Sequence, residues 1–111
     1  MESISAAMLL KALDGLSLRA SATAENIANS GTPGYRPARV EFEQLLASAS
    51  HGSKGSVEAV RPAITRGPDG EPLRLDMELA TASTTAMRYA ALIELLGRQI
   101  HIQSLSVQGN R

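Results

Sequence analysis

The feature that most constrains this chain is a pair of long apolar series, one near each end. In residues 4–29, apolar or small side chains recur at alternating spacings of four and three residues: Leu9, Leu13, Leu16, Ala20, Thr23 and Ile27. A second series of the same kind occupies residues 77–107: Leu79, Ala82, Ala86, Tyr89, Ile93, Leu96, Ile100, Gln103 and Val107. This spacing lines up side chains along one face of an α-helix, as in a coiled coil. The sequence therefore predicts two long helices.

Helix signals support both predictions. Ser3 is an N-cap candidate for the first helix, which would be roughly 39 Å long at 1.5 Å per residue. Asp76 is the N-cap candidate for the second helix, and Glu78 suits the positive end of its dipole. Gly97 lies inside the second helix and lowers its stability, so it predicts a close backbone approach or a local bend.

The placement of the two series predicts the topology. Their lengths are comparable and they lie at opposite ends of a chain of 111 residues, which is enough for one domain. The simplest way to bury both seams is an antiparallel coiled-coil hairpin. We therefore expect an all-α fold in which residues 1–30 and 73–111 form one discontinuous helical domain, with residues 31–72 as a loop or linker excursion.

The excursion has weak signals of its own. Apolar side chains in residues 42–46 have helical spacing and predict a short helix or docking turn. Residues 47–56 are small, polar and rich in glycine, which predicts a flexible linker. Residues 57–66 have the composition of a short extended segment that Pro62 restricts to a sheet edge, and residues 67–72 form a turn cluster. We expect a mostly irregular segment with room for a short strand or hairpin.

Both predicted helices also carry apolar side chains away from their seams. Ile4 and Leu18 lie nearly opposite the first seam, and Met87 and Leu105 lie on the back or side of the second. These positions can be ordinary core, but two helices alone cannot cover them all. Only 3% of the residues are aromatic, so the chain is poorly equipped to be a compact monomer. Packing of identical or related subunits would bury the surplus, and open contacts of that kind build helical filaments.

The segment between Asn26 and Arg36 ends the first helix. Gly31 stands where a left-handed residue often follows a helix, and Pro33 with Gly34 is a turn pair. Asparagine at a helix end can bond free carbonyl groups, and tyrosine combines an apolar ring with a polar tip. The residues expected to shape this exit are Asn26, Asn29, Pro33, Gly34 and Tyr35.

Several classes of function lack support. The chain has 11 basic and 11 acidic residues, so no basic stripe indicates a nucleic-acid partner. It has no cysteine, and no catalytic, metal-binding or phosphate-binding motif accompanies His51 or His101. We therefore expect no cofactor, no metal and no small-molecule substrate. The apolar run in residues 6–10 is too short for a membrane span and lacks the cationic lead of a cleaved secretory signal.

Two sets of motifs resemble a known family. Asn26-Ile27-Ala28-Asn29, followed by Thr32-Pro33-Gly34-Tyr35-Arg36, resembles the signature that closes the N-terminal helix in the axial proteins of the bacterial flagellum, the rod and hook proteins. Asp76-Met77-Glu78-Leu79-Ala80 and the stretch from Ala86 to Leu96 are similar to the proximal rod members. The resemblance covers residues 1–46 and about 73–105. Thr85 stands where the family pattern has asparagine, and the middle segment is shorter than is usual.

The resemblance implies a structural role without catalytic activity. Such proteins leave the cytoplasm through the flagellar type III export apparatus without a cleaved signal peptide. They assemble helically into the rod of the flagellum basal body, which crosses the periplasm. The implied partners are other copies of the chain, other rod proteins, the rod-adapter protein and the inner-membrane ring.

The residues expected at subunit interfaces come from both helices. They are the seam positions Leu9, Leu13, Leu16, Tyr89, Ile93 and Leu96, and the back-face positions Ile4, Leu18, Met87 and Leu105. The first alternative is a helical binding module that acts as an export chaperone or adaptor. The second is a small hydrolase that uses His51 or His101, for which the sequence offers little support.

Overall fold

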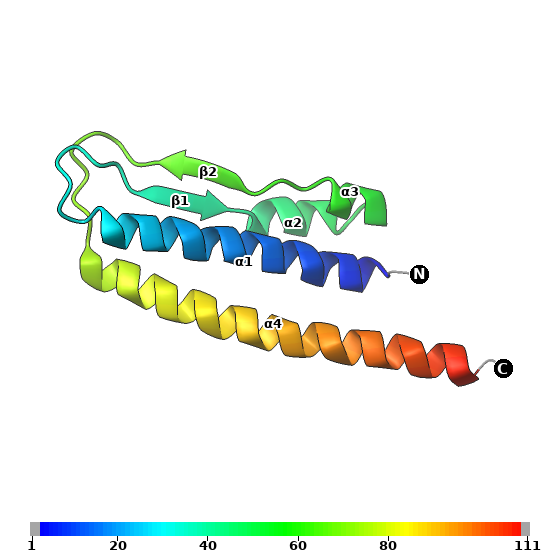
Figure 1. The fold of residues 1–111 in the computed structure, drawn as a ribbon. Coiled ribbons are helices and arrows are strands. Elements are labelled where there is room, and N and C mark those ends of the chain that lie inside the picture. The colour runs from blue at the N-terminus through cyan, green and yellow to red at the C-terminus, as the bar shows by residue number, and fades with distance from the viewer. Residues whose placement is uncertain (1–2, 110–111) are drawn as a thin grey trace.

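The computed structural model describes residues 3–109 as an elongated, mostly helical molecule (Figure 1). Its elements are α1 (Ile4–Ala28), β1 (Ala38–Glu41), α2 (Glu43–Ala49), α3 (Lys54–Glu58), β2 (Ala63–Arg66) and α4 (Leu75–Gly109). The molecule measures 63 × 25 × 14 Å along its principal axes. A long N-terminal helix and a long C-terminal helix are present as predicted, with a small two-stranded sheet between them in the sequence.

The first helix begins where the sequence predicted. The Ser3 hydroxyl accepts a hydrogen bond from the backbone N–H of Ala6 at 3.1 Å, which confirms Ser3 as the N-cap. The helix ends at Ala28, where the Asn29 backbone N–H and side-chain amide both donate to the carbonyl of Glu25. The prediction that Gly31 would be left-handed is wrong, because the helix closes earlier. Among the described residues only Gly34 and Gly70 have positive φ angles.

The predicted turn after α1 is confirmed. The backbone N–H of Tyr35 donates to the carbonyl of Thr32 at 3.2 Å, and Gly34 has a φ of 76°. Proline at the second position and a left-handed glycine at the third are typical of a type II turn. The turn sends the chain back along α1.

The returning chain forms the short hairpin for which the sequence left room in the middle segment, although no strand was predicted at Ala38–Glu41. β1 pairs antiparallel with β2, from Ala38 opposite Arg66 to Glu41 opposite Ala63. Side chains of β1 alternate between buried and exposed, whereas those of β2 are all exposed. Of the extended segment expected at residues 57–66, only Ala63–Arg66 forms a strand, and the first two residues belong to α3.

The predicted flexible linker at residues 47–56 is wrong. α2 continues through Ala49, and α3 begins after Ser53, whose hydroxyl caps it by accepting from the Ser56 N–H at 3.2 Å. Val57 of α3 is fully buried. The turn cluster further on is confirmed, since the Glu71 N–H donates to the carbonyl of Pro68.

The core lies between α1 and this middle segment. It consists of two clusters: Leu16, Ala22, Ala38, Val40 and Phe42 in one, and Ala7, Leu46 and Val57 in the other. Gly15 allows a close approach here, because a Cβ added to it would lie 2.4 Å from the Phe42 ring. Leu18 is half-buried beside the first cluster. Of the two back-face positions predicted on the first helix, Leu18 is therefore partly covered by the chain itself, whereas Ile4 is exposed.

The second long helix differs in detail from its prediction. It begins at Leu75, so Asp76 lies in the first turn and is not the N-cap. The close approach expected at Gly97 is wrong, since a Cβ there would meet nothing within 4 Å. α4 lies along α1 with both chain termini at the same end of the molecule (Figure 1). The Gln99 side chain donates to the Ser3 hydroxyl, so Gln99 lies level with the start of α1. The turns of α4 that follow Gln99 extend past α1 (Figure 1).

Candidate functional site

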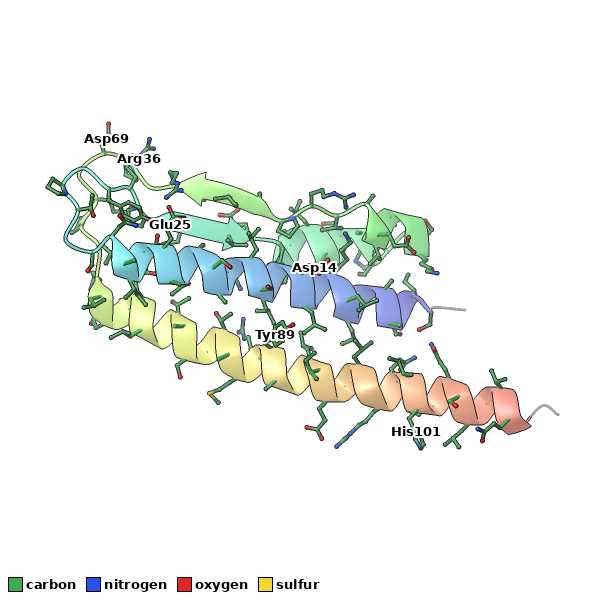
Figure 2. The ribbon with its side chains drawn as sticks, viewed as in Figure 1. Asp14, Glu25, Arg36, Asp69, Tyr89 and His101 are labelled. Carbon is green, nitrogen blue, oxygen red and sulfur yellow. The ribbon has the colours of Figure 1, made fainter. Side chains whose placement is uncertain are left out.

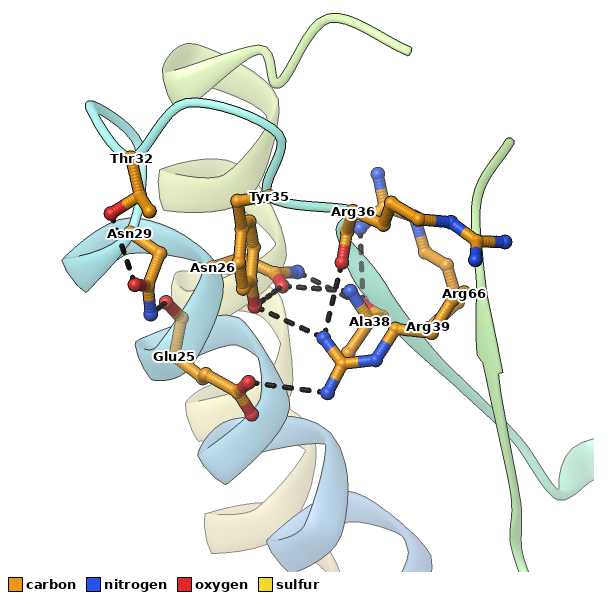
Figure 3. A network of polar contacts seen from close by, with 9 residues as sticks. All are labelled: Glu25, Asn26, Asn29, Thr32, Tyr35, Arg36, Ala38, Arg39 and Arg66. Atoms are coloured by element: carbon orange, nitrogen blue, oxygen red, sulfur yellow. Dashed lines mark hydrogen bonds and ion pairs between the residues drawn. The ribbon is translucent and has the colours of Figure 1, made fainter. Parts of the chain in front are cut away.

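Asn26 is the centre of a buried polar junction at the end of α1 (Figure 3). Its Nδ2 donates to the carbonyl of Ala38 at 2.9 Å and to the Glu78 carboxylate at 3.0 Å. Its Oδ1 accepts from the Ala38 N–H at 2.8 Å and from the Tyr35 hydroxyl at 2.7 Å. The expected bond to a free helix carbonyl is therefore made by Asn29 and not by Asn26. Asn26 instead joins α1 to the turn, to β1 and to α4.

Glu78 completes this junction from α4. Its side chain is 5% exposed, and its second carboxylate oxygen lies 2.8 Å from Nη1 of Arg39. A buried carboxylate is stable only when it is paired and hydrogen-bonded. Asn26 and Arg39 together meet that need, so the start of α4 is held against β1.

Arg66 ties β2 to the same end of the molecule (Figure 3). Its guanidinium lies over the Tyr35 ring, 5.7 Å from the centroid. Its nitrogens donate to the carbonyl of Arg36 at 3.1 Å and to the carboxylate of Glu25 at 3.2 Å. The half-buried Tyr35 thus has the apolar ring and bonded tip that the sequence predicted, while Pro33 and Gly34 are exposed on the turn.

A second polar cluster fixes α2 on α1. The Arg19 guanidinium donates to both oxygens of the Glu43 carboxylate, at 2.6 and 2.8 Å, and to the carbonyl of Val40. It also lies 4.9 Å from the centroid of the Phe42 ring. The hydrogen bonds from Arg19 lower the pKa of Glu43 to about 2. This cluster holds β1 and α2 against α1.

One of the two heptad positions of the α4 seam is displaced by one residue from its prediction, and the other is retained. The α4 positions of reduced exposure repeat at heptad spacing: Glu78, Ala82, Thr85, Leu92, Leu96, Gln99 and Gln103. The predicted seam positions Leu79, Ala86, Ile93 and Ile100 are exposed, as is Tyr89. Val107 is exposed as well, so six of the nine predicted α4 seam positions are wrong, and Ala82, Leu96 and Gln103 are right. The helix buries its more polar heptad positions and leaves its more apolar ones uncovered.

We call this uncovered series, Leu79, Ala86, Ile93, Ile100 and Val107, the α4 stripe. No charged residue occurs between Leu79 and Met87. Met87 and Leu105, predicted as back-face positions, are also exposed, and Figure 2 shows α4 with its outer side chains pointing into open space. Exposed apolar side chains therefore lie on more than one side of α4, and uncovered apolar faces often mark interaction sites.

The predicted interface positions of α1 have a different environment. Leu13 and Leu16 are buried within the chain, and Leu9 is half-buried. Ile4, near the start of the helix, is exposed. On α4, Leu96 is half-buried. The available apolar surface therefore belongs mainly to α4.

An open groove runs between the two long helices. Its volume is about 420 Å³, and its walls are Leu16, Ser17, Ala20, Ala24 and Ile27 of α1 with Ala82, Thr85, Ala86 and Tyr89 of α4. We call it the α1–α4 groove. Most of its lining side chains are small, so the two helices do not fill the space between them. The predicted hairpin, in which the two seams bury each other, did not anticipate this groove.

Within residues 3–109, no cluster of three or more histidine, cysteine or acidic side chains has the geometry of a metal site. His51 and His101 are both exposed and lie on different elements. In the same range, no helix combines the length and apolarity that a bilayer span requires.

Comparison of the chain with protein-family models and with curated proteins finds no match. The resemblance to flagellar axial proteins therefore rests on the motifs of residues 26–36 and 76–96.

Proposed function

We propose that this chain is a structural subunit of the bacterial flagellar rod. Within the rod, the motifs of α4 most resemble those of the proximal rod protein FlgB. The axial-protein motif supports this role, because its residue Asn26 bonds Glu78 and so links α1 to α4, while the Tyr35 hydroxyl donates to Asn26.

The observation that carries the proposal is the uncovered apolar surface of α4. Leu79, Ile93 and Ile100 are each about half exposed, at 53%, 48% and 56%. Heptad spacing of such residues is typical of a face that receives another helix. A subunit of a helical assembly has neighbours that bury this face, whereas a free monomer does not.

In this proposal, α1 and α4 pair as an antiparallel coiled-coil hairpin in the inner part of the rod. Two hydrogen bonds support the pairing: Asn26 to Glu78 near one end, and Gln99 to Ser3 near the other. The middle segment packs on α1 and is directed away from α4 over most of its length (Figure 1). It leaves the outer side of α4 free for neighbouring subunits.

The proposed partners are other copies of the chain, other rod proteins, the rod-adapter protein and the inner-membrane ring. The type III export apparatus would deliver the chain, without a cleaved signal peptide, to the periplasm-spanning rod. The role needs no catalytic activity, cofactor or nucleic acid.

The experiment is deletion of the gene in a flagellated host that encodes this chain, followed by electron cryotomography of basal bodies. We expect basal bodies without rods and loss of motility, both restored by the intact gene. Rods of normal appearance in the deletion strain would contradict the proposal. A stable dimer that promotes export of rod proteins but is absent from isolated basal bodies would instead support an export chaperone or adaptor.

A further inference from the structure

The surface of α4 carries two heptad series offset by one residue. One series faces α1 and includes Glu78, Thr85 and Gln99; the other is the uncovered α4 stripe. At about 100° per residue, the stripe lies roughly 100° around the helix axis from Glu78, Thr85 and Gln99. The half-buried Ala82, Leu96 and Gln103 lie between the two series. The face that they form with the stripe is therefore centred roughly 50° from the face that they form with the α1-facing series. In a bundle of three mutually touching helices, each helix meets its two neighbours roughly 60° apart. A helix seated on the stripe would therefore also reach α1.

The α1–α4 groove lies where that helix would fit. Its walls include Ser17, Ala20 and Ala24 of α1, and Ala82 and Ala86 of α4. Ala86 belongs to both the groove and the stripe, so the two surfaces are continuous. Small side chains on both walls permit close approach of a helix backbone, since interaxial distance depends on side-chain size at the contact.

We propose that the α1–α4 groove and the α4 stripe together seat α4 of a second copy of this chain. The helices α1, α4 and the incoming α4 then form a three-helix bundle. This inference rests on the proposed function in one respect: it names the neighbour that covers α4 in the assembly.

The exposed side chains identify α4 as the incoming helix. Leu13 and Leu16 of α1 are already buried by their own chain, and α1 keeps only Ile4 and Leu10 as exposed large apolar residues. The α4 stripe spans residues 79–107, roughly 42 Å of helix. α4 is therefore the element of the described chain that can offer a long apolar face to the groove.

The charges of α4 fit the same placement. Arg88, Glu94 and Arg98 lie more than about 100° around the helix from the stripe. Arg98 and Glu94 bond each other at 2.7 Å, and Arg88 lies 3.8 Å from Glu43 of α2. Seating α4 through its stripe thus buries none of these charged groups, which avoids the cost of desolvating them.

A matched pair of variants tests the surface. Ile93 and Leu95 are isomeric side chains on α4 with 48% and 49% exposure, and only Ile93 lies in the stripe. We expect Ile93→Gln to raise the dissociation constant of self-association about tenfold or more, as loss of a buried aliphatic side chain does. We expect Leu95→Gln to leave it within about twofold. Sedimentation velocity over a concentration series measures both.

Two outcomes of that experiment would overturn the inference. One is a wild-type chain that remains monomeric at the highest concentration reached. The other is a Leu95→Gln variant that dissociates while Ile93→Gln does not. Both residues are exposed, so circular dichroism should show unchanged helicity and rule out loss of folding as the cause.

Cysteine cross-linking identifies the incoming helix, and the chain has no cysteine to interfere. One copy carries Ser17→Cys on the groove wall; the other carries Ala86→Cys, Ile93→Cys, Ile100→Cys or Leu95→Cys. We expect oxidation to join Ser17→Cys to at least one stripe position and not to Leu95→Cys. Cross-links only to Leu95→Cys, or only to cysteines placed on α1 of the second copy, would overturn the assignment.

These measurements use the purified chain, so their outcome does not depend on whether the chain is a rod subunit. Self-association through the stripe in a chain whose deletion leaves rods intact would uphold the inference and reject the rod. Missing rods together with association through Leu95 would uphold the proposed function and reject the inference.

Discussion

The two long helices of this chain share a sequence pattern but have different surroundings. α1 packs against α4 on one side and against β1, α2 and α3 on the other. α4 packs mainly on α1 and leaves large apolar side chains exposed along its length. The comparison shows that similar heptad series can serve different purposes. The α1 series is used within the chain, and much of the α4 series remains available to a partner.

The largest effect on stability is expected from truncating a buried leucine of α1, and an exposed leucine of α4 is the control. Leu16 of α1 is 3% exposed and Leu105 of α4 is 52% exposed. We expect Leu16→Ala to lower the free energy of unfolding by about 2–5 kcal/mol, because it leaves a cavity in the core. We expect Leu105→Ala to change it by less than about 0.5 kcal/mol. Urea unfolding of the dilute chain measures both values, and similar losses would contradict the comparison of the two helices.

The second prediction concerns the junction where the helices meet. Asn26→Ala removes four hydrogen bonds and leaves the backbone of Ala38 and the carboxylate of Glu78 short of partners. Since these groups are buried, we expect a loss of about 1–3 kcal/mol in the free energy of unfolding. Asn29→Ala is the control, because Asn29 bonds exposed groups of the helix end. An equal loss in both variants would mean that the junction does not hold α4 to α1.

The sequence was sufficient to predict the two helices because heptad spacing is a local signal. It could not decide between the overlapping series of α4, which differ by one residue. Glu78 is buried because Asn26 and Arg39, distant in the sequence, supply its partners. Apolarity alone favoured Leu79. The choice is thus made by tertiary contacts that a periodicity analysis does not contain.

The middle segment was mispredicted for a related reason. Residues 47–56 have the composition of a linker, yet Ser53 caps α3 and brings Val57 into the core. A single buried valine carries too little signal to be recognised in advance. Asn26 was singled out from its motif, but its bonds to Ala38 and Glu78 cross 12 and 52 residues and could not be predicted.

The third prediction concerns the contact between Arg19 and Glu43, which holds α2 on α1. The pKa of Glu43 is lowered from 4.5 to about 2, chiefly by its hydrogen bonds with Arg19. A lowered folded-state pKa gives stability that is complete above pH 4.5 and is lost as the pH falls toward 2. Glu43 is half exposed, so we expect a contribution below about 1 kcal/mol. Glu43→Gln should flatten this part of the pH profile of unfolding, measured by urea titrations between pH 2 and 7, and a profile identical to that of the wild-type chain would contradict the prediction.

The last prediction compares local unfolding of the two helices by hydrogen exchange. The lowest free energies of local opening are expected at the end of α4. Gln99 bonds Ser3 at the start of α1, so residues 100–109 lie beyond it, and their large apolar side chains are more than half exposed. In the dilute protein we expect their amide hydrogens to exchange with an opening free energy near zero, while those around Leu13 require opening of the core. At concentrations where the chain associates, protection should spread along α4 and change little in α1. Strong protection of residues 100–109 in the monomer would mean that α4 is stable without a neighbour, and the exposed stripe would then no longer require one.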